Sequence, residues 1–215
     1  MKALAVAIAV FGAGAGLWAL APTAMPAKTD AASKPRQASV TQLGPQRDRI
    51  FLTDVQLSQA LKAGTIDRPI RSLLAVKAPM HFGDYAWNDT AVPDGRTWIR
   101  IDLRSQLISV FRAGHEIGTA VIVYGGDNKE TPVGTLQVLA KARDHRSSLY
   151  EAEMPYMLRL TDDGVAIHAS NVRWGAATHG CIGVPLAFAQ RLFGATRIGD
   201  EVVIVQAEPN NPRTS

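Results

Sequence analysis

Hydrophobic and polar residues alternate at a period of two from residue 97 onward. Ile99, Ile101 and Leu103 fall on one face of such a strand, and the polar segment Arg104-Ser105-Gln106 interrupts the pattern before a second run at residues 107–112. Alternation of this kind indicates a half-buried strand, and a short polar break between two strands indicates a hairpin. We therefore predict a β-hairpin over residues 97–112.

The apolar segments that follow predict more strands. Ala113-Gly114 supplies the next turn, and residues 120–124 contain no charged position, which is typical of a strand covered on both faces. Short apolar segments between turn residues predict strands at residues 115–124, 135–139, 157–160, 165–168 and 201–205.

Two segments have helical signals instead. Thr53 and Gln56 have the spacing of a capping box, and an apolar stripe at helical spacing continues as far as Gly64, so we predict a helix over residues 54–63. A second helix is predicted over residues 185–193, where the leading proline suits a first helical turn. The predicted domain is mainly β, with at least one packed helix.

The N-terminal residues have the composition of an export segment. Residues 1–21 carry one cation, Lys2, followed by an uncharged apolar stretch, as in a signal peptide or a membrane anchor. Ala19-Leu20-Ala21 fits a cleavage site, whereas Pro22 directly after it disfavours cleavage, so both interpretations stay open. We expect an exported protein of the periplasm or cell envelope, anchored in the inner membrane if the segment is retained.

Composition divides the rest of the chain. Residues 22–48 are rich in Ala, Pro, Ser, Thr, Lys and Gln without hydrophobic periodicity, which predicts a flexible linker. Residues 49–95 form an N-terminal extension with the first helix, residues 96–206 form the main domain, and residues 207–215 form a tail. With 47% hydrophobic and 20% charged residues, the chain can bury one ordinary core.

The charge balance bears on partners. A formal net charge of +4 suits an anionic surface, such as a cell-wall polymer or lipid headgroups. The charges are scattered, without a Lys/Arg block or interleaved aromatic residues. We therefore expect no binding of nucleic acid.

The candidate chemistry centres on Cys181, the only cysteine of the chain. It ends the segment Thr178-His179-Gly180-Cys181, and a second histidine, His168, ends an apolar run upstream. A thiol nucleophile needs a base within hydrogen-bond reach and a third group that orients the base. We expect the predicted helix that follows Cys181 to favour its thiolate, and backbone N–H groups at Gly180 and Cys181 to hold an oxyanion. This pattern indicates acyl-transfer chemistry.

These residues resemble the L,D-transpeptidase catalytic domain family. The family motif of a histidine, a loop and Ser/Thr-His-Gly-Cys is matched by Ile167-His168 and Thr178-His179-Gly180-Cys181. The family's Thr-Pro-x-Gly element is matched by Thr131-Pro132-Val133-Gly134, and Gly199-Asp200-Glu201-Val202 also fits. The resemblance covers about residues 96–206 and implies a β-sandwich with a few short helices.

The resemblance implies a role for each matching position. Cys181 would be the nucleophile, and His168 would be the base, oriented by the backbone carbonyl of Ala169. His179 would support the site. Gly180 and Cys181 would supply the N–H groups of the oxyanion hole.

The resemblance also implies the reaction, which needs no cofactor. The enzyme would attack the L-centre to D-centre bond of a peptidoglycan stem tetrapeptide and release D-alanine. The acyl group would pass to an amine of a second stem or of a wall-linked protein. A tyrosine hydroxyl from Tyr150 or Tyr156 would complete the oxyanion hole. Ala169, Asn171 and Trp174 are further candidates for contact with the substrate.

Two departures from the family pattern affect the substrate pocket. Gly183 stands where the family usually has Arg or Asn, and only nine residues separate His168 from Thr178, fewer than is usual. Arg173, within this short loop, could replace the missing cation and bind a stem-peptide carboxylate, because a guanidinium pairs with carboxylates through two hydrogen bonds.

Other interpretations remain open at this point. A cysteine hydrolase of L,D-carboxypeptidase type would use the same residues and differ only in whether water reaches the acyl-enzyme. His168, His179 and Cys181 are acceptable zinc ligands, although no fourth ligand accompanies them. A catalytically inactive wall-binding protein is the third alternative. We expect surface or packing roles for His81, His115 and His145.

Overall fold

The computed structural model of the protein describes residues 48–206, apart from residues 64–65, 67, 77, 127–128 and 148–150. The predicted leader (residues 1–21), almost all of the linker, the tail (residues 207–215) and Tyr150 lie outside the described residues. None of the helices in the described part of the chain is long and apolar enough to cross a membrane.

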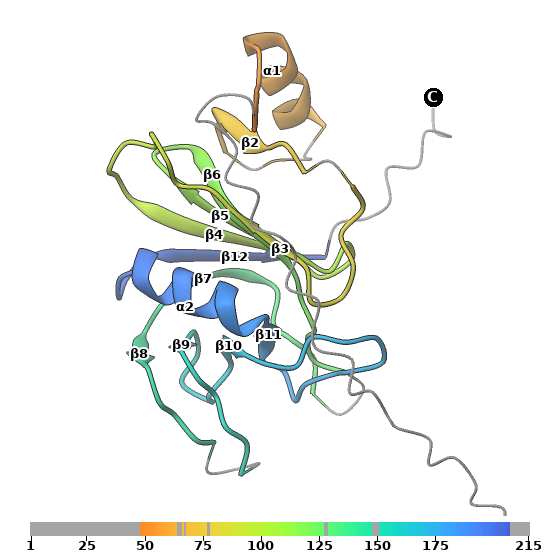
Figure 1. The fold of residues 1–215 in the computed structure, drawn as a ribbon, viewed down its shortest axis with the longest axis vertical. Coiled ribbons are helices and arrows are strands. Elements are labelled where there is room, and N and C mark those ends of the chain that lie inside the picture. Colours follow the sequence, from red (N-terminus) through yellow and green to blue (C-terminus); the bar gives the residue numbers. More distant parts are fainter. Residues whose placement is uncertain are drawn as a thin grey trace, which may run out of the picture. The chain divides into compact units, whose positions relative to one another are not determined.

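The larger sheet holds the predicted hairpin at its centre (Figure 1). Its strands are β1 (Arg49–Phe51), β2 (Ser72–Leu74), β3 (Tyr85–Trp87), β4 (Thr97–Asp102), β5 (Leu107–Arg112), β6 (His115–Val121), β7 (Gly134–Gln137) and β12 (Glu201–Val205). The strand order is β1-β2-β6-β5-β4-β12-β7, with β3 also paired to β6. The register Ile99↔Val110 and Ile101↔Ile108 confirms the hairpin, and Ile99 and Ile101 are fully buried, as their alternation predicts.

The smaller sheet carries the candidate catalytic segments. It consists of β8 (Ala140–Ala142), β9 (Met157–Arg159), β10 (Ala166–Ala169) and β11 (Ile182–Val184), in the order β11-β10-β9-β8. Strands β10 and β11 are parallel, whereas the other pairs are antiparallel. The smaller sheet therefore places the segment before β11 beside β10, although the two are far apart in sequence.

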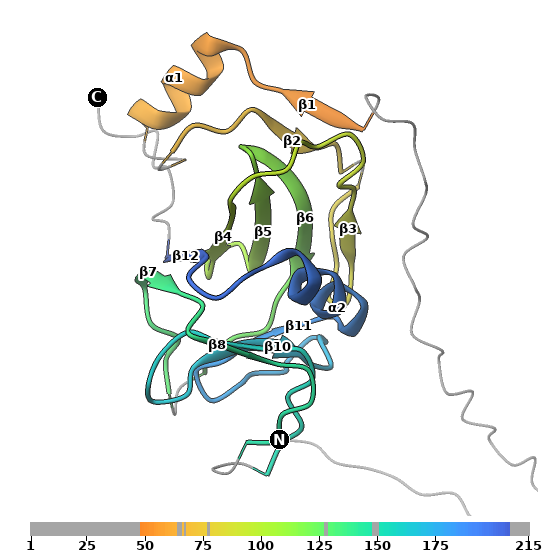
Figure 2. The same cartoon turned by 90° about the vertical axis from the view of Figure 1, so that its left-hand side faces the viewer.

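Helix α2 (Leu186–Ala195) lies between the two sheets in Figure 2 and contacts β6 of the larger sheet and β9 and β10 of the smaller one. Its Phe188 is fully buried and packs edge-on against Tyr85 and Trp87, with ring centroids 6.2 and 5.5 Å away. The main core combines apolar side chains of both sheets and α2. The fold is thus mainly β, two packed sheets with few helices, as predicted.

The first helix forms at its predicted position but outside the core. In α1 (Asp54–Lys62), the Thr53 side chain accepts a hydrogen bond from the Gln56 backbone N–H, and the Gln56 side chain accepts one from the Thr53 N–H. This reciprocal pair is the capping box expected from the sequence. No residue of α1 is buried, so its caps, rather than core packing, hold this helix.

Five strands were not predicted: β1, β2, β3, β8 and β11. Each is three residues long, which is too short for an alternating pattern to stand out. Three of them belong to residues 49–95, where only a helix was expected, and they join the larger sheet through β2 and β3 beside β6. These segments become strands because they pair with a neighbouring strand, and not because of their local sequence.

Gly183 lies where the chain leaving β6 meets β11. The Val123 N–H donates to the Gly183 carbonyl at 3.0 Å, and the Gly183 N–H donates to the Val123 carbonyl at 2.8 Å. A Cβ atom at Gly183 would lie 2.7 Å from both Ser170 Cβ and Val123 Cγ2. The departure from the family pattern at this position therefore lies in a backbone pairing where the neighbouring side chains leave no room for a Cβ atom.

We expect Gly183→Ala to destabilise the protein by about 1–3 kcal/mol, since overpacking forces neighbouring atoms to move. Gly194→Ala is the matched control, because a Cβ there meets nothing within 4 Å and alanine is favoured over glycine within helices by about 0.5–1 kcal/mol. Urea unfolding of the three proteins measures both effects. Equal stability of Gly183→Ala and the wild type would contradict the crowding at this junction.

Candidate active site

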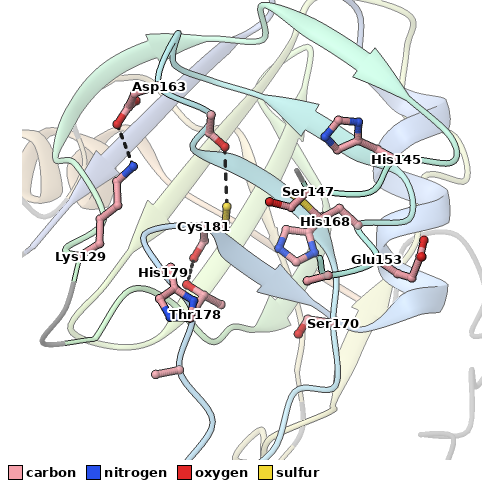
Figure 3. Close-up of a pocket in the computed structure, with 14 residues that line it drawn as sticks. Lys129, His145, Ser147, Glu153, Asp163, His168, Ser170, Thr178, His179 and Cys181 are labelled. Atoms are coloured by element: carbon pink, nitrogen blue, oxygen red, sulfur yellow. Dashed lines mark hydrogen bonds and ion pairs between the residues drawn. The ribbon is translucent and has the colours of Figure 1, made fainter. Parts of the chain in front are cut away.

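A cavity of about 310 Å³ opens along β10 and the turn before β11 (Figure 3). It brings together Cys181, His168 and His179, the three side chains for which the sequence predicted catalytic roles. The residues that line it are Lys129, His145, Ser147, Ala152, Glu153, Met154, Asp163, Gly164, His168, Ser170, Ala177, Thr178, His179 and Cys181.

Strand pairing explains why His168 and Cys181 share one face of the smaller sheet. Ile167 and Ile182 are register partners in the parallel pair β10–β11, and both are buried in the main core. Successive side chains of a strand point to opposite faces. His168 and Cys181, each next to one of these isoleucines, therefore point away from the main core and into the cavity.

His168 is oriented by the backbone carbonyl that the resemblance implied. Its Nδ1 lies 2.8 Å from the carbonyl oxygen of Ala169. A carbonyl only accepts hydrogen bonds, so Nδ1 carries the proton and Nε2 of the neutral ring is left with its lone pair. Burial lowers the pKa of His168, with a smaller opposing effect from the Ala169 bond and a further lowering by the nearby His145. The ring is thus a neutral base at neutral pH.

Burial raises the pKa of the Cys181 thiol, while a backbone hydrogen bond from Ala166 and the positive charge of Lys129 act in the opposite direction. The thiol donates a weak hydrogen bond to the Gly164 carbonyl at 3.8 Å. The expected support from a helix start was wrong, because β11 and Pro185 separate Cys181 from α2. The resting pair is therefore a neutral thiol beside a neutral imidazole, and the thiol has to lose its proton as it reacts.

The turn that carries Cys181 depends on glycine at two positions. Gly180 has a φ of +91°, in the left-handed region that favours glycine. The chain at Gly125 approaches so closely that a Cβ there would lie 2.8 Å from the Gly180 Cα. The Thr178 hydroxyl donates to the Cys181 carbonyl, and the Thr178 N–H donates to the Tyr124 carbonyl at 3.0 Å. The nucleophile turn is fixed from both sides.

Thr131 joins these two close segments. Its buried hydroxyl donates to the Gly180 carbonyl at 3.0 Å and accepts from the Gly125 N–H at 2.9 Å. The Thr-Pro-x-Gly element identified in the sequence therefore supplies a hydroxyl that holds the turn before the nucleophile. Thr131 positions Cys181 without lining the cavity.

We expect Thr131→Val to cost about 1–3 kcal/mol of stability, because it keeps the side-chain shape but removes the hydroxyl partner of the part-buried Gly125 N–H and the buried Gly180 carbonyl. Thr131→Ser keeps the hydroxyl and is the control. Urea unfolding gives the stability, and the rate of Cys181 alkylation by iodoacetamide reports the position of the thiol. A valine variant that equals the serine variant in both measurements would show that the hydroxyl does not hold the turn.

The predicted tyrosine contact is not supported by the position of Tyr156. Tyr156 does not line the cavity; its ring packs edge-on against Phe193 at 5.8 Å between centroids, and the Arg143 guanidinium lies 5.7 Å from its ring centroid. Tyr156 is therefore a packing residue at α2, and Tyr150 lies outside the described residues. Ala169, a predicted substrate contact, is buried and instead holds His168 through its carbonyl.

The middle of the loop after β10 does not line the cavity. Val172 is buried in a small apolar cluster beside the larger sheet, and this contact holds the middle of the loop. Asn171 and Arg173 are exposed and do not line the cavity. Trp174 is 84% exposed and packs edge-on against Phe82 at 5.8 Å. The substrate contacts predicted for these three residues are therefore not reproduced by their positions.

Other residues line the cavity that sequence reasoning did not single out. They include Lys129, Asp163, Ser147, Glu153 and His145, the last of which we expected on the surface or in packing. These residues come from loops that have no periodic pattern. The position of Lys129 two residues before the Thr-Pro-x-Gly element was the one available signal. Among the described residues, no three His, Cys, Asp or Glu side chains are grouped as for a metal ion.

The chain has the same kind of fold as several solved L,D-transpeptidases. No curated protein matches the chain. The chain is similar in structure to an L,D-transpeptidase from Stackebrandtia nassauensis (21% identity, TM-score 0.48), covering 55% of this chain and 60% of that one. It is also similar to an L,D-transpeptidase from Mycobacterium tuberculosis (25%, TM-score 0.47, 51% and 57% covered). A third is L,D-transpeptidase 3 from Mycobacterium tuberculosis in complex with a faropenem-derived adduct (23%, TM-score 0.45, 52% and 60% covered).

The matched part of the chain thus spans 57–60% of the length of these three structures. The family is shown by a match to a family model rather than by these structures. The model of the L,D-transpeptidase catalytic domain matches residues 96–204, which include Thr131, His168 and Cys181. Because this match covers about half of the sequence, the protein belongs to the L,D-transpeptidase catalytic domain family.

Proposed function

We propose that this protein is an L,D-transpeptidase that acts on peptidoglycan stem peptides through an acyl-enzyme on Cys181. One observation carries the proposal. The only cysteine of the chain lies in a cavity with a histidine whose Nδ1 is held by a backbone carbonyl, which leaves Nε2 to act as a base. A thiol and an oriented histidine base in one cavity are the two groups that nucleophilic acyl transfer needs.

The first half-reaction forms a thioester. The Cys181 sulfur attacks the carbonyl carbon of the bond between the L-centre and the terminal D-alanine, and His168 Nε2 takes the thiol proton as the carbon–sulfur bond forms. The negative charge on the carbonyl oxygen is stabilised by N–H groups at Gly180 and Cys181. The carbon–nitrogen bond then breaks, His168 returns the proton to the leaving amine, and D-alanine departs.

The second half-reaction transfers the acyl group to an amine. The acceptor nitrogen attacks the thioester carbonyl and gives a proton to His168, and the departing sulfur takes this proton back. His179 is exposed at the cavity wall, where it supports the site beside the entering acceptor. Transfer rather than hydrolysis requires that the amine reaches the thioester before water does.

The acceptor and the location of the enzyme follow from the substrate. Stem peptides are part of the cell wall, so the enzyme would act in the periplasm or cell envelope after export through residues 1–21. The acceptor would be a second stem or a wall-linked protein. Residues 96–206 would form the catalytic domain, with the strands of residues 49–95 as an extension of its larger sheet.

The test is incubation of the full-length protein with a disaccharide-tetrapeptide, with products identified by mass spectrometry. A cross-linked dimer that has lost one D-alanine supports the transpeptidase. Disaccharide-tripeptide alone would assign the protein as a hydrolase of L,D-carboxypeptidase type. Unchanged substrate in the presence of folded enzyme, for donors with either free or wall-linked acceptors, would contradict both and favour a wall-binding protein without activity.

A further inference from the structure

An ion pair lies across the cavity wall from the proposed base. Lys129 Nζ is 2.8 Å from Asp163 Oδ2, and Figure 3 shows both side chains on the side of Cys181 opposite His168. The pKa of Asp163 is held below its usual range by hydrogen bonds from Lys129 and Thr161. Both members of the pair line the cavity.

The stem of Lys129 is held against the nucleophile turn. A Cβ atom at Gly180 would lie 3.2 Å from Lys129 Cγ and 3.3 Å from Lys129 Cδ. Gly180 therefore gives the lysine stem room to lie across the turn directly before Cys181. The charge of Lys129 lowers the pKa of the Cys181 thiol, and that of Asp163 raises it. The ion pair is therefore close enough to the sulfur to affect its protonation.

The two partners differ in their exposure to solvent. The Asp163 side chain is 64% exposed and that of Lys129 is 34% exposed. A pair with an exposed carboxylate is screened by water and contributes little. A second carboxylate that enters the cavity, where water is partly excluded, can therefore replace Asp163 as the partner of Lys129.

We propose that Lys129 binds the terminal carboxylate of the donor peptide beside the scissile bond, in exchange for Asp163. The inference rests on the proposed function, in which the leaving residue is a D-amino acid with a free carboxylate. The carboxyl carbon of that residue is two bonds from the scissile nitrogen, so it has to lie near Cys181 during attack. The sequence analysis assigned carboxylate binding to Arg173, but Arg173 is exposed and does not line the cavity. Lys129 supplies the cation in its place.

A pair of thiol reagents tests the carboxylate site without any need for peptide turnover. Iodoacetate and iodoacetamide alkylate the same sulfur and differ in one carboxylate. Their rate ratio at Cys181 cancels changes in thiolate fraction that affect both reagents. We expect Lys129→Met to lower the iodoacetate/iodoacetamide ratio roughly 3- to 10-fold, Lys129→Arg to keep it, and Asp163→Asn to raise it. Lys62→Met, an exposed lysine of α1 away from the cavity, is the control.

Peptide donors test the same site in catalysis. Against a tetrapeptide with a free terminal carboxylate, we expect Lys129→Met to raise KM about 10-fold and to leave KM for the terminal amide unchanged. An equal loss with acid and amide, or an unchanged reagent ratio, would overturn the carboxylate site and assign Lys129 to the thiol alone. A Lys129-dependent reagent ratio without turnover of any donor by the wild type would support this site and contradict the proposed function.

Discussion

Cys181→Ala is expected to lower the rate of D-alanine release from a tetrapeptide donor by at least about 10³-fold, because the acyl-enzyme cannot form without the nucleophile. The chain contains no second cysteine, so no other thiol can take over. The partly buried side chain contacts a small apolar cluster, and alanine preserves most of this packing. Release is followed by a coupled assay for free D-alanine.

Two controls separate chemistry from folding in this experiment. The melting temperature of Cys181→Ala should stay close to that of the wild type, and Cys181→Ser keeps a hydroxyl of similar size at the same position. A serine hydroxyl is a much weaker nucleophile than a thiolate at neutral pH, so we expect it to be nearly as slow as alanine. D-alanine release by Cys181→Ala within tenfold of the wild-type rate would refute the nucleophile assignment.

The second large effect is expected for His168→Ala, which should slow acylation by about 10²- to 10⁴-fold, the usual contribution of a positioned base. Burial lowers the pKa of His168, so protonation removes the base only below the usual imidazole range. The acid limb of the wild-type pH–rate profile should therefore lie below pH ~6.5. Because burial raises the pKa of Cys181, the rate of the variant should instead keep rising into the alkaline range.

The profile is measured as the rate of D-alanine release between acid and alkaline pH. His81→Ala is the matched control, since His81 is exposed, pairs with Asp84 and does not line the active-site cavity. It should reproduce the wild-type profile. An acid limb that persists in His168→Ala at the same pH would mean that another group is the base, with His145 and His179 as the remaining histidines of the cavity.

The hairpin and the first helix could be predicted because short stretches of sequence specify them. The hairpin of β4 and β5 was predicted because Ile99, Ile101 and Leu103 alternate with other residues and a polar turn separates them from a second run at residues 107–112. The capping box fixed the start of α1. Strand β11 was missed because its three residues become a strand only through their pairing with β10. This omission also led to the wrong expectation that Cys181 lies at a helix start.

The candidate site likewise contains residues that a local motif identifies and residues that only the fold brings together. Cys181 and His168 were identified from residue type and spacing, and the register of β10 and β11 brings them to one face. Lys129 and Asp163 are 34 residues apart, and neither has a pattern that links it to the thiol. Trp174 was a candidate for substrate contact, but it packs against Phe82, and the neighbouring Val172 is buried in a cluster outside the cavity.

The central claim is an acyl-enzyme on Cys181, and intact-protein mass spectrometry tests it most directly. The full-length protein is incubated with a tetrapeptide donor whose amines are acetylated, so that the donor cannot also act as acceptor. The reaction is quenched in acid and the protein is mapped by proteolysis. We expect a mass increase equal to the tripeptide acyl group, located on Cys181 and lost when an amine acceptor is added before the quench. An adduct on any other residue, or an adduct that persists in Cys181→Ala, would contradict the account.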